Sequence, residues 1–205
     1  MPLAASELIL NADGSVYHLN LLPEDIADTI IVVGDPDRVA AVSGHFDQID
    51  VKKSKREFIT HTGWYKSKRF TVISTGSGTD NIDIALNELD ALVNIDLPTR
   101  TVKPELKSLK FIRIGTSGAI QEDIPVDSFL LSEKGIGLDG LMHFYRKASD
   151  RSAFELALSQ HLNWKTDHVE PYTYDADESL LQKLGSNRIL VGSTLTNTGF
   201  YAPQG

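Results

Sequence analysis

Short apolar runs alternate with amphipathic stretches along the whole chain. A β-branched run at residues 29–33 ends in Gly34, and a second apolar run at residues 109–114 ends at Gly115. Runs of this length and composition are typical of buried strands. The same pattern predicts strands at residues 56–61, 69–74, 126–131 and 188–194, with a turn near Gly63.

Helical spacing of apolar residues appears between these strands. Asp35 and Pro36 supply an N-cap and a first-turn proline for one helix. A second helix begins at Asp80, and its apolar face carries Ile82, Ala85, Leu86, Leu89, Leu92 and Val93. Further helices are expected from Asp150 and after a capping box formed by Asp175 and Glu178. Residues 102–107 and 135–146 are predicted loops.

Interleaved strands and helices without repeats or a linker predict one layered α/β domain over residues 1–205. The net charge of −8 argues against a nucleic-acid partner or an anionic membrane surface. The absence of cysteine excludes disulfides, thiolate catalysis and cysteine-based metal sites. The six histidines have no metal-ligand spacing, so no metal is expected. The first 16 residues lack a signal-peptide pattern, and we expect a cytoplasmic protein.

The turn after the first strand combines three features that favour anion binding. Gly34 ends the strand, a helix N-terminus follows, and Arg38 lies in the first helical turn. An arginine there opposes the helix dipole unless an anion lies between them. The alternative is a capped helix whose Arg38 pairs with Asp35 or Asp37. The local sequence leaves both interpretations open.

Arg113 is the second informative residue. Alternation places Phe111 and Arg113 on one face of a strand that we expect near the core, where an unpaired charge is costly. Its partner is either an internal carboxylate or an anionic ligand. We favour the ligand, because α/β sheets bind ligands beyond the carboxyl ends of their strands. Thr116, Ser117 and Gly118 follow directly and supply hydroxyl groups and small residues.

A third strand-to-helix turn, at residues 74–79, is rich in glycine and hydroxyl groups. It is neither a Walker A loop nor a dinucleotide fingerprint, because Asn81 stands where the third glycine of the fingerprint belongs. From the residues alone, the chain is an α/β protein with a phosphate-sized site formed by Gly34, Arg38 and Arg113.

Six segments together resemble the nucleoside phosphorylase-I family, most closely its uridine phosphorylase branch. They occur in the family's order and span nearly the whole chain. The segments are His18-Leu-Asn-Leu21, Gly34-Asp-Pro-Asp-Arg-Val39, Arg56-Glu-Phe58, Ser74-Thr-Gly76, Ile112-Arg-Ile-Gly-Thr-Ser-Gly-Ala-Ile-Gln121 and Gly199-Phe-Tyr-Ala-Pro-Gln204. The resemblance implies a three-layer α/β/α fold with a mixed central sheet.

The resemblance also implies a set of site residues. Phosphate would be held by Gly34, Arg38, Arg113 and Thr116, together with Arg56 of the neighbouring subunit. The nucleoside would contact Thr116, Ser117, Gly118, Phe200 and Gln204, together with His18 of the neighbouring subunit. Without the resemblance, Arg56 and His18 would be interpreted as an exposed charge and an ordinary loop residue.

The implied reaction is the reversible phosphorolysis of uridine or a related pyrimidine nucleoside to free base and ribose 1-phosphate. Arg38 and Arg113 would orient the phosphate, and Gln204 would stabilise the leaving base. Inorganic phosphate is a co-substrate, and no metal or organic cofactor is implied. The minimum active unit would be a homodimer, and the family assembles as hexamers built from dimers.

The sequence departs from the family pattern after Gln204. Family members continue with an arginine that pairs with the base-binding glutamine and a Glu-Met-Glu segment that binds the ribose, and residues 1–205 contain neither. We therefore expect either a fragment lacking the C-terminal part of the family domain or a truncated relative that has lost catalysis. The alternative functions are a purine nucleoside phosphorylase or nucleosidase of the same fold, and a non-catalytic anion- or nucleoside-binding remnant.

Overall fold

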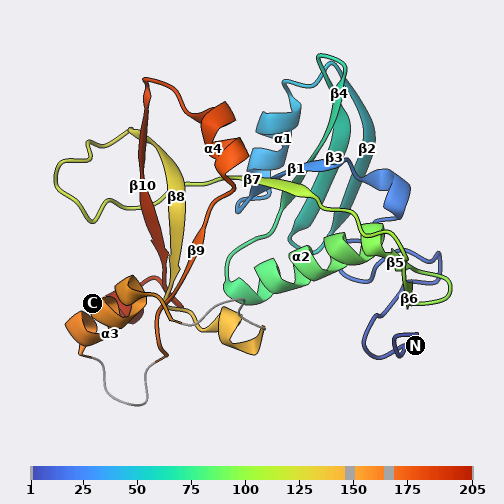
Figure 1. Ribbon diagram of the computed structural model, residues 1–205. Coiled ribbons are helices and arrows are strands. Elements are labelled where there is room, and N and C mark those ends of the chain that lie inside the picture. Colours follow the sequence, from blue (N-terminus) through green and yellow to red (C-terminus); the bar gives the residue numbers. More distant parts are fainter. Residues whose placement is uncertain (1, 146–150, 164–168, 205) are drawn as a thin grey trace. The chain divides into compact units, whose positions relative to one another are not determined.

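The computed structural model describes residues 2–145, 151–163 and 169–204, and these form two compact units, residues 1–116 and 117–205 (Figure 1). The expectation of a single domain over residues 1–205 stays a prediction. Within the described residues, no helix is both long and apolar enough to cross a membrane.

The first unit is built on a five-stranded sheet in the order β2-β3-β4-β1-β7. Its strands and helices are β1 (Thr29–Val33), α1 (Asp37–Ser43), β2 (Gln48–Lys55), β3 (Phe58–Tyr65), β4 (Lys68–Ser74), α2 (Thr79–Asn94) and β7 (Lys110–Ile114). β1 pairs in parallel with both β4 and β7, whereas β2, β3 and β4 form antiparallel pairs. A short 3-10 helix, η1 (Pro23–Asp25), precedes β1, and a two-stranded ladder, β5 (Ile95–Asp96) with β6 (Thr101–Val102), follows α2.

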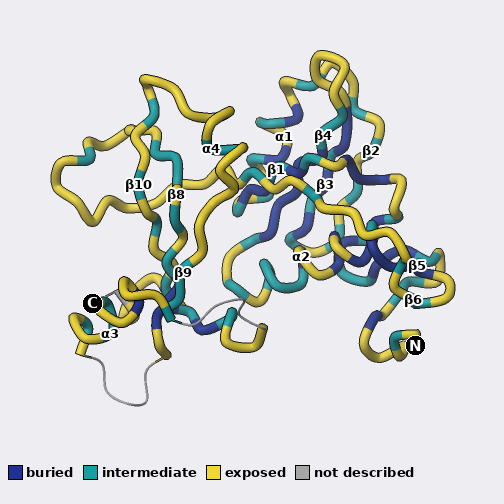
Figure 2. The backbone as a smooth tube through the Cα atoms, viewed as in Figure 1, coloured by how far each residue is buried: buried dark blue, intermediate teal, exposed yellow. Residues whose placement is uncertain are grey.

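Alternation along β1 explains why this sheet is covered on both faces. Ile30 and Val32 belong to a core cluster that contains Leu89 and Leu92 of α2. Val33 packs instead with α1 in a second cluster. The first unit therefore has three layers, helix on sheet on helix, and most of the buried positions lie here (Figure 2). The predicted α/β class with a mixed sheet is confirmed.

The second unit has a three-stranded sheet in the order β10-β8-β9. Its elements are β8 (Phe129–Gly137), η2 (Leu141–Phe144), α3 (Ala153–Leu162), β9 (Tyr172–Asp175), α4 (Glu178–Leu184), β10 (Ile189–Thr196) and η3 (Ala202–Gln204). β8 and β10 are parallel, and β9 is antiparallel to β8. β10 follows the prediction closely.

Several predicted boundaries in the first unit are wrong. Gly63 lies inside β3, and the hairpin turns at Lys66 and Ser67, whose φ angles of 46° and 64° are left-handed. α1 begins at Asp37, one residue after the predicted proline position, although Asp35 Oδ1 still accepts a hydrogen bond from the Asp37 amide. Leu86 is exposed, whereas we expected it on the buried face of α2.

Other boundaries are wrong in the second unit. The strand predicted at Val126 begins at Phe129, because the chain turns at Asp127, where φ is 65°. β8 and η2 occupy much of the predicted loop at 135–146, of which residue 146 lies outside the described residues. Asp177, not Asp175, caps α4. Asp150 also lies outside the described residues, and α3 begins at Ala153 with a capping box of Ser152 and Glu155.

Candidate functional site

Three turns lie together at the carboxyl ends of the parallel strands β4, β1 and β7. Gly34 follows β1, Gly76 lies just after β4, and Gly115 follows β7. A Cβ placed on Gly34 would lie 3.6 Å from the carbonyl oxygen of Gly76, so the first two turns are neighbours. Gly76 has a left-handed φ of 68°, which favours glycine. This edge is where α/β sheets bind ligands.

Arg38 extends from the first turn of α1 beside Gly34 and is partly buried. Asp35 caps the amide of Asp37 and does not pair with Arg38. No carboxylate among the described residues lies within ion-pair distance of Arg38. The interpretation of Arg38 as the partner of Asp35 or Asp37 is therefore wrong.

Arg113 lies in β7 opposite Val32 of β1 and shares a face with Phe111, as alternation predicted. Its guanidinium lies against Gly115: a Cβ on Gly115 would be 2.0 Å from Arg113 Nη1. Glycine therefore leaves room for the guanidinium at the carboxyl end of the strand. Arg113 also has no ion pair within the described part of the chain.

Arg113 is more exposed than the sequence predicted. We expected a charge near the core that burial would force into a pair, but Arg113 is exposed. The reason is that β7 is the edge strand of its sheet. What distinguishes Arg113 is a charge beside the glycine turns that no described carboxylate pairs, and not its burial.

His18 and Arg56 both lie close to one aromatic ring, that of Tyr17. The rings of Tyr17 and His18 meet edge to face with centroids 4.9 Å apart, and Arg56 Cζ lies 5.8 Å from the Tyr17 centroid. Arg56 occupies the two-residue turn between β2 and β3 with φ of 56°. It was expected within the strand. The two residues assigned to the neighbouring subunit's site therefore lie within one small region.

The remaining candidates divide between the two units. Thr116 ends the first unit, whereas Ser117, Gly118, Phe200 and Gln204 belong to the second. Phe200 is 76% exposed and meets Tyr201 edge to face at 5.5 Å. Its loop is closed by a hydrogen bond from Asn197 Nδ2 to the Pro203 carbonyl oxygen, 2.9 Å. Gln204 ends η3.

Comparison with known proteins decides the family. The model of the phosphorylase superfamily matches residues 28–204. The chain belongs to this superfamily.

Relatives and solved structures agree with this assignment. The chain is 30% identical over 193 residues to a uridine phosphorylase of Thermococcus kodakarensis, covering 94% of this chain and 59% of the relative. It is 38% identical over 132 residues to the Escherichia coli uridine phosphorylase, covering 63% and 47%. The chain thus spans about half the length of these relatives.

A Trypanosoma brucei nucleoside phosphorylase, whose crystal structure is described as having uridine phosphorylase activity, matches with a TM-score of 0.83 and 30% identity. The match covers 96% of this chain and 71% of the other. This coverage includes residues of both units. The nucleoside phosphorylase fold expected from the sequence is confirmed.

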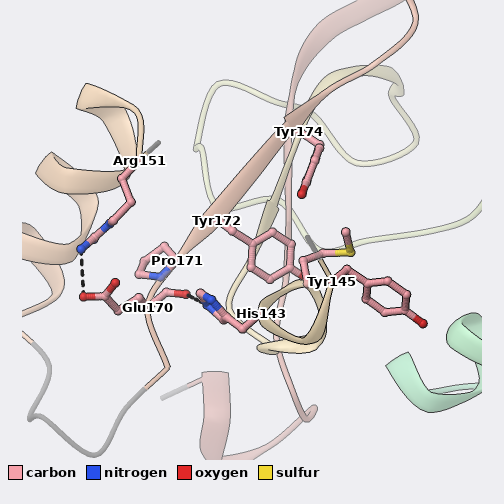
Figure 3. A pocket seen from close by; sticks show the side chains of 8 residues that line it. His143, Tyr145, Arg151, Glu170, Pro171, Tyr172 and Tyr174 are labelled. Carbon is pink, nitrogen blue, oxygen red and sulfur yellow. Dashed lines mark hydrogen bonds and ion pairs between the residues drawn. The ribbon is translucent and has the colours of Figure 1, made fainter. Parts of the chain in front are cut away.

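The second unit contains a separate cavity of about 220 Å³ (Figure 3). Tyrosines 145, 172 and 174, His143 and the Arg151–Glu170 pair contribute to its lining. Burial and a hydrogen bond to Asp139 raise the pKa of Tyr172 far above its ordinary value. None of the residues predicted for the site lines this cavity, so it is not part of the predicted phosphate and nucleoside site.

Sequence reasoning missed two residues that contact Tyr17 and His18. Lys55 Nζ lies 4.2 Å from the centroid of the Tyr17 ring and also donates to the Tyr17 carbonyl oxygen. Glu88 of α2 contacts His18 directly. Helical spacing contained a signal for Glu88, because residues 85, 88, 89 and 92 share one face of α2 and only residue 88 is charged.

Proposed function

We propose that this protein is a uridine phosphorylase, which converts uridine and inorganic phosphate reversibly into uracil and ribose 1-phosphate. The relatives named above support the pyrimidine substrate. The observation that carries the proposal is the pair of arginines, Arg38 and Arg113, beside the adjoining turns of Gly34, Gly76 and Gly115. Neither arginine is neutralised by a described carboxylate, and backbone close to glycine is open to a tetrahedral anion.

The reaction begins with weakening of the bond between the base and the anomeric carbon. The ribose acquires oxocarbenium character, a phosphate oxygen forms the new bond to that carbon, and uracil departs with the electron pair. Arg38, Arg113 and Thr116 orient the phosphate for this attack, which lowers the entropic part of the barrier. Gln204 donates a hydrogen bond to the departing base as negative charge gathers on it. Phosphate is a co-substrate, and the proposal needs no organic cofactor or metal.

The nucleoside contacts Ser117 and Gly118 as well as Phe200, whose exposed ring offers an apolar face to the pyrimidine. His18 and Arg56 complete the site of a neighbouring subunit. Their common contact with Tyr17 supports this assignment, because one surface region then carries both residues across the interface. The proposed active unit is therefore at least a homodimer.

The test is release of base by the protein expressed from its complete coding sequence. Uracil should form from uridine only when phosphate is present, with one ribose 1-phosphate per uracil. Equal release without phosphate would indicate a nucleosidase, and preference for inosine would indicate a purine phosphorylase. Phosphate binding without turnover of any nucleoside would indicate a non-catalytic remnant. Each of these three results would replace the proposal.

A further inference from the structure

Glu88 is an acidic residue on the buried face of α2. It lies between Ala85, Leu89 and Leu92 along the helix, and its side chain is 11% exposed. A carboxylate in such surroundings is costly unless hydrogen-bond donors surround it. The groups that donate hydrogen bonds to Glu88 therefore indicate which residues its carboxylate fixes in position.

Within the described part of the chain, all the hydrogen bonds that Glu88 accepts come from residues 18 and 19. The His18 amide donates to Oε1 and Oε2 at 2.9 and 3.0 Å, and the Leu19 amide donates to Oε2 at 2.8 Å. His18 Nδ1 lies 2.6 Å from Oε1. One carboxylate thus fixes both the backbone and the imidazole of His18, from 70 residues away in sequence.

The same segment is also anchored independently of Glu88. Leu19 is fully buried in the main core, and Lys55 Nζ donates to the Tyr17 carbonyl oxygen and to Asn11 Oδ1. Loss of the Glu88 charge should therefore leave the fold in place. The imidazole, by contrast, has no other described hydrogen-bond partner, since Nε2 makes no hydrogen bond within the described part of the chain.

The chemistry of the contact determines the proton's position. A carboxylate only accepts, so the proton of a neutral His18 must lie on Nδ1, and Nε2 is left with a free lone pair. We propose that Glu88 is a positioning residue, which holds His18 in the orientation and tautomer that let Nε2 accept a hydrogen bond from the ribose 5′-hydroxyl of nucleoside bound to the neighbouring subunit. The identity of the substrate rests on the proposed function.

Glu88→Gln tests this with little change of shape. The backbone N–H groups of residues 18 and 19 can only donate, so the amide oxygen turns toward them and the amide nitrogen faces His18 Nδ1. Nδ1 must then accept, and the ring proton moves to Nε2. The variant reverses the tautomer, so that Nε2 can only donate to the hydroxyl and can no longer accept from it.

The first measurement is ¹⁵N NMR of the histidine rings in the complete protein, at a pH at which the imidazole is neutral, with His18→Gln used to assign the signal. The wild-type protein should carry the His18 proton on Nδ1, and Glu88→Gln should carry it on Nε2. A wild-type proton on Nε2 would overturn the proposal. This measurement does not depend on turnover, and its wild-type arm does not depend on the variant folding.

The second measurement compares uridine with 5′-deoxyuridine, which lacks the hydroxyl that His18 should contact. Glu88→Gln should lower kcat/KM for uridine about 3- to 10-fold, the effect of one hydrogen bond, and leave 5′-deoxyuridine unchanged. Asp90→Asn removes a carboxylate from the exposed side of the same helix, where it accepts a hydrogen bond from Asn94, and should change neither value.

The two proposals fail in different ways. If the wild-type protein releases no uracil, the proposed function is wrong, and the NMR measurement alone decides whether Glu88 sets the His18 tautomer. If wild type is active but Glu88→Gln slows both substrates equally, the role of Glu88 is merely structural and the positioning proposal is wrong.

Discussion

At the scale of single residues, Arg38 and Arg113 carry charges that no described carboxylate neutralises. If phosphate is their partner, Arg113→Ala removes a charge-assisted hydrogen bond. We expect a higher KM for phosphate and a fall in kcat/KM of about 10- to 100-fold. Initial rates over a range of phosphate concentrations measure this.

Arg188→Ala is the matched control, since Arg188 is exposed just before β10, outside the predicted site. Its phosphate KM should match that of the wild-type protein. An Arg113→Ala variant with an unchanged KM for phosphate would remove Arg113 from the phosphate site.

His61 gives a prediction about stability. Desolvation by burial, and secondarily the charge of Lys52, lower the pKa of His61 below its ordinary 6.5, and Nδ1 hydrogen-bonds to Ser43 Oγ at 2.7 Å. As the pH falls through 6.5, the unfolded chain takes up a proton that the folded protein does not. The free energy of unfolding should therefore decrease with falling pH below 6.5, until the pH reaches the folded-state pKa.

Denaturant unfolding between pH 8 and pH 5 checks this expectation. His61→Gln should show a shallower loss of unfolding free energy over the acidic part of this range than wild type. His45→Gln, at an exposed position, should follow the wild-type profile. Identical pH profiles for wild type and His61→Gln would contradict the role given to His61.

At the scale of elements, Gly63 determines how closely β2 and β3 approach. It lies opposite Ile49, next to an irregularity at which Asp50 has no partner in the register. A Cβ on Gly63 would lie 2.1 Å from the Gln48 carbonyl oxygen and 2.9 Å from Ile49 Cα. Because these are backbone atoms, Gly63→Ala should lower the free energy of unfolding by about 1–3 kcal/mol.

Chemical denaturation measures the effect. Gly135→Ala in β8 is the control, because its nearest non-neighbouring atom would be 3.9 Å away, and it should change stability by no more than about 0.5 kcal/mol. Equal stability of Gly63→Ala and wild type would mean that the strands can separate at the irregularity without cost.

The same glycine illustrates what sequence can predict at this scale. β1 and β7 were predictable because continuous β-branched or apolar runs have few alternatives to a buried strand. Gly63 was mistaken for a turn, since a glycine required for close strand approach and one required for a turn look alike in sequence. The actual turn uses Lys66 and Ser67 in left-handed conformations, which local composition did not indicate.

The residues of the candidate site also differ in whether the sequence alone could predict them. Gly34 and Arg38 were recognisable because strand end, glycine and helix start are consecutive in the sequence. Glu88 was missed because its contact with His18 spans 70 residues, and only its position on a buried helical face hinted at it. The assignments of His18 and Arg56 came from the family resemblance, because a residue that serves another subunit has no local signature.

At the scale of the whole molecule, the proposal requires each site to combine residues of two subunits. A variant lacking Arg56 and a variant lacking Arg113 should then each be impaired for different reasons. In a mixed dimer, one site would have both lesions, but the other would receive an intact Arg113 from its own chain and an intact Arg56 from its neighbour. This follows from the symmetry of a two-fold interface, in which both subunits use the same surface.

We therefore predict that a mixture of the Arg56→Ala and Arg113→Ala proteins is more active than either variant alone. Random exchange of subunits makes half of the dimers mixed, and each mixed dimer has one intact site, so phosphorolysis should recover to about a quarter of the wild-type rate. Co-expression ensures exchange, and a mixture of Arg113→Ala with Arg38→Ala is the control, because both lesions belong to the same subunit's half of the site and no intact site can form. No recovery in the test mixture would place Arg56 in the site of its own chain, and recovery in the control would mean that Arg38 and Arg113 serve the sites of different subunits.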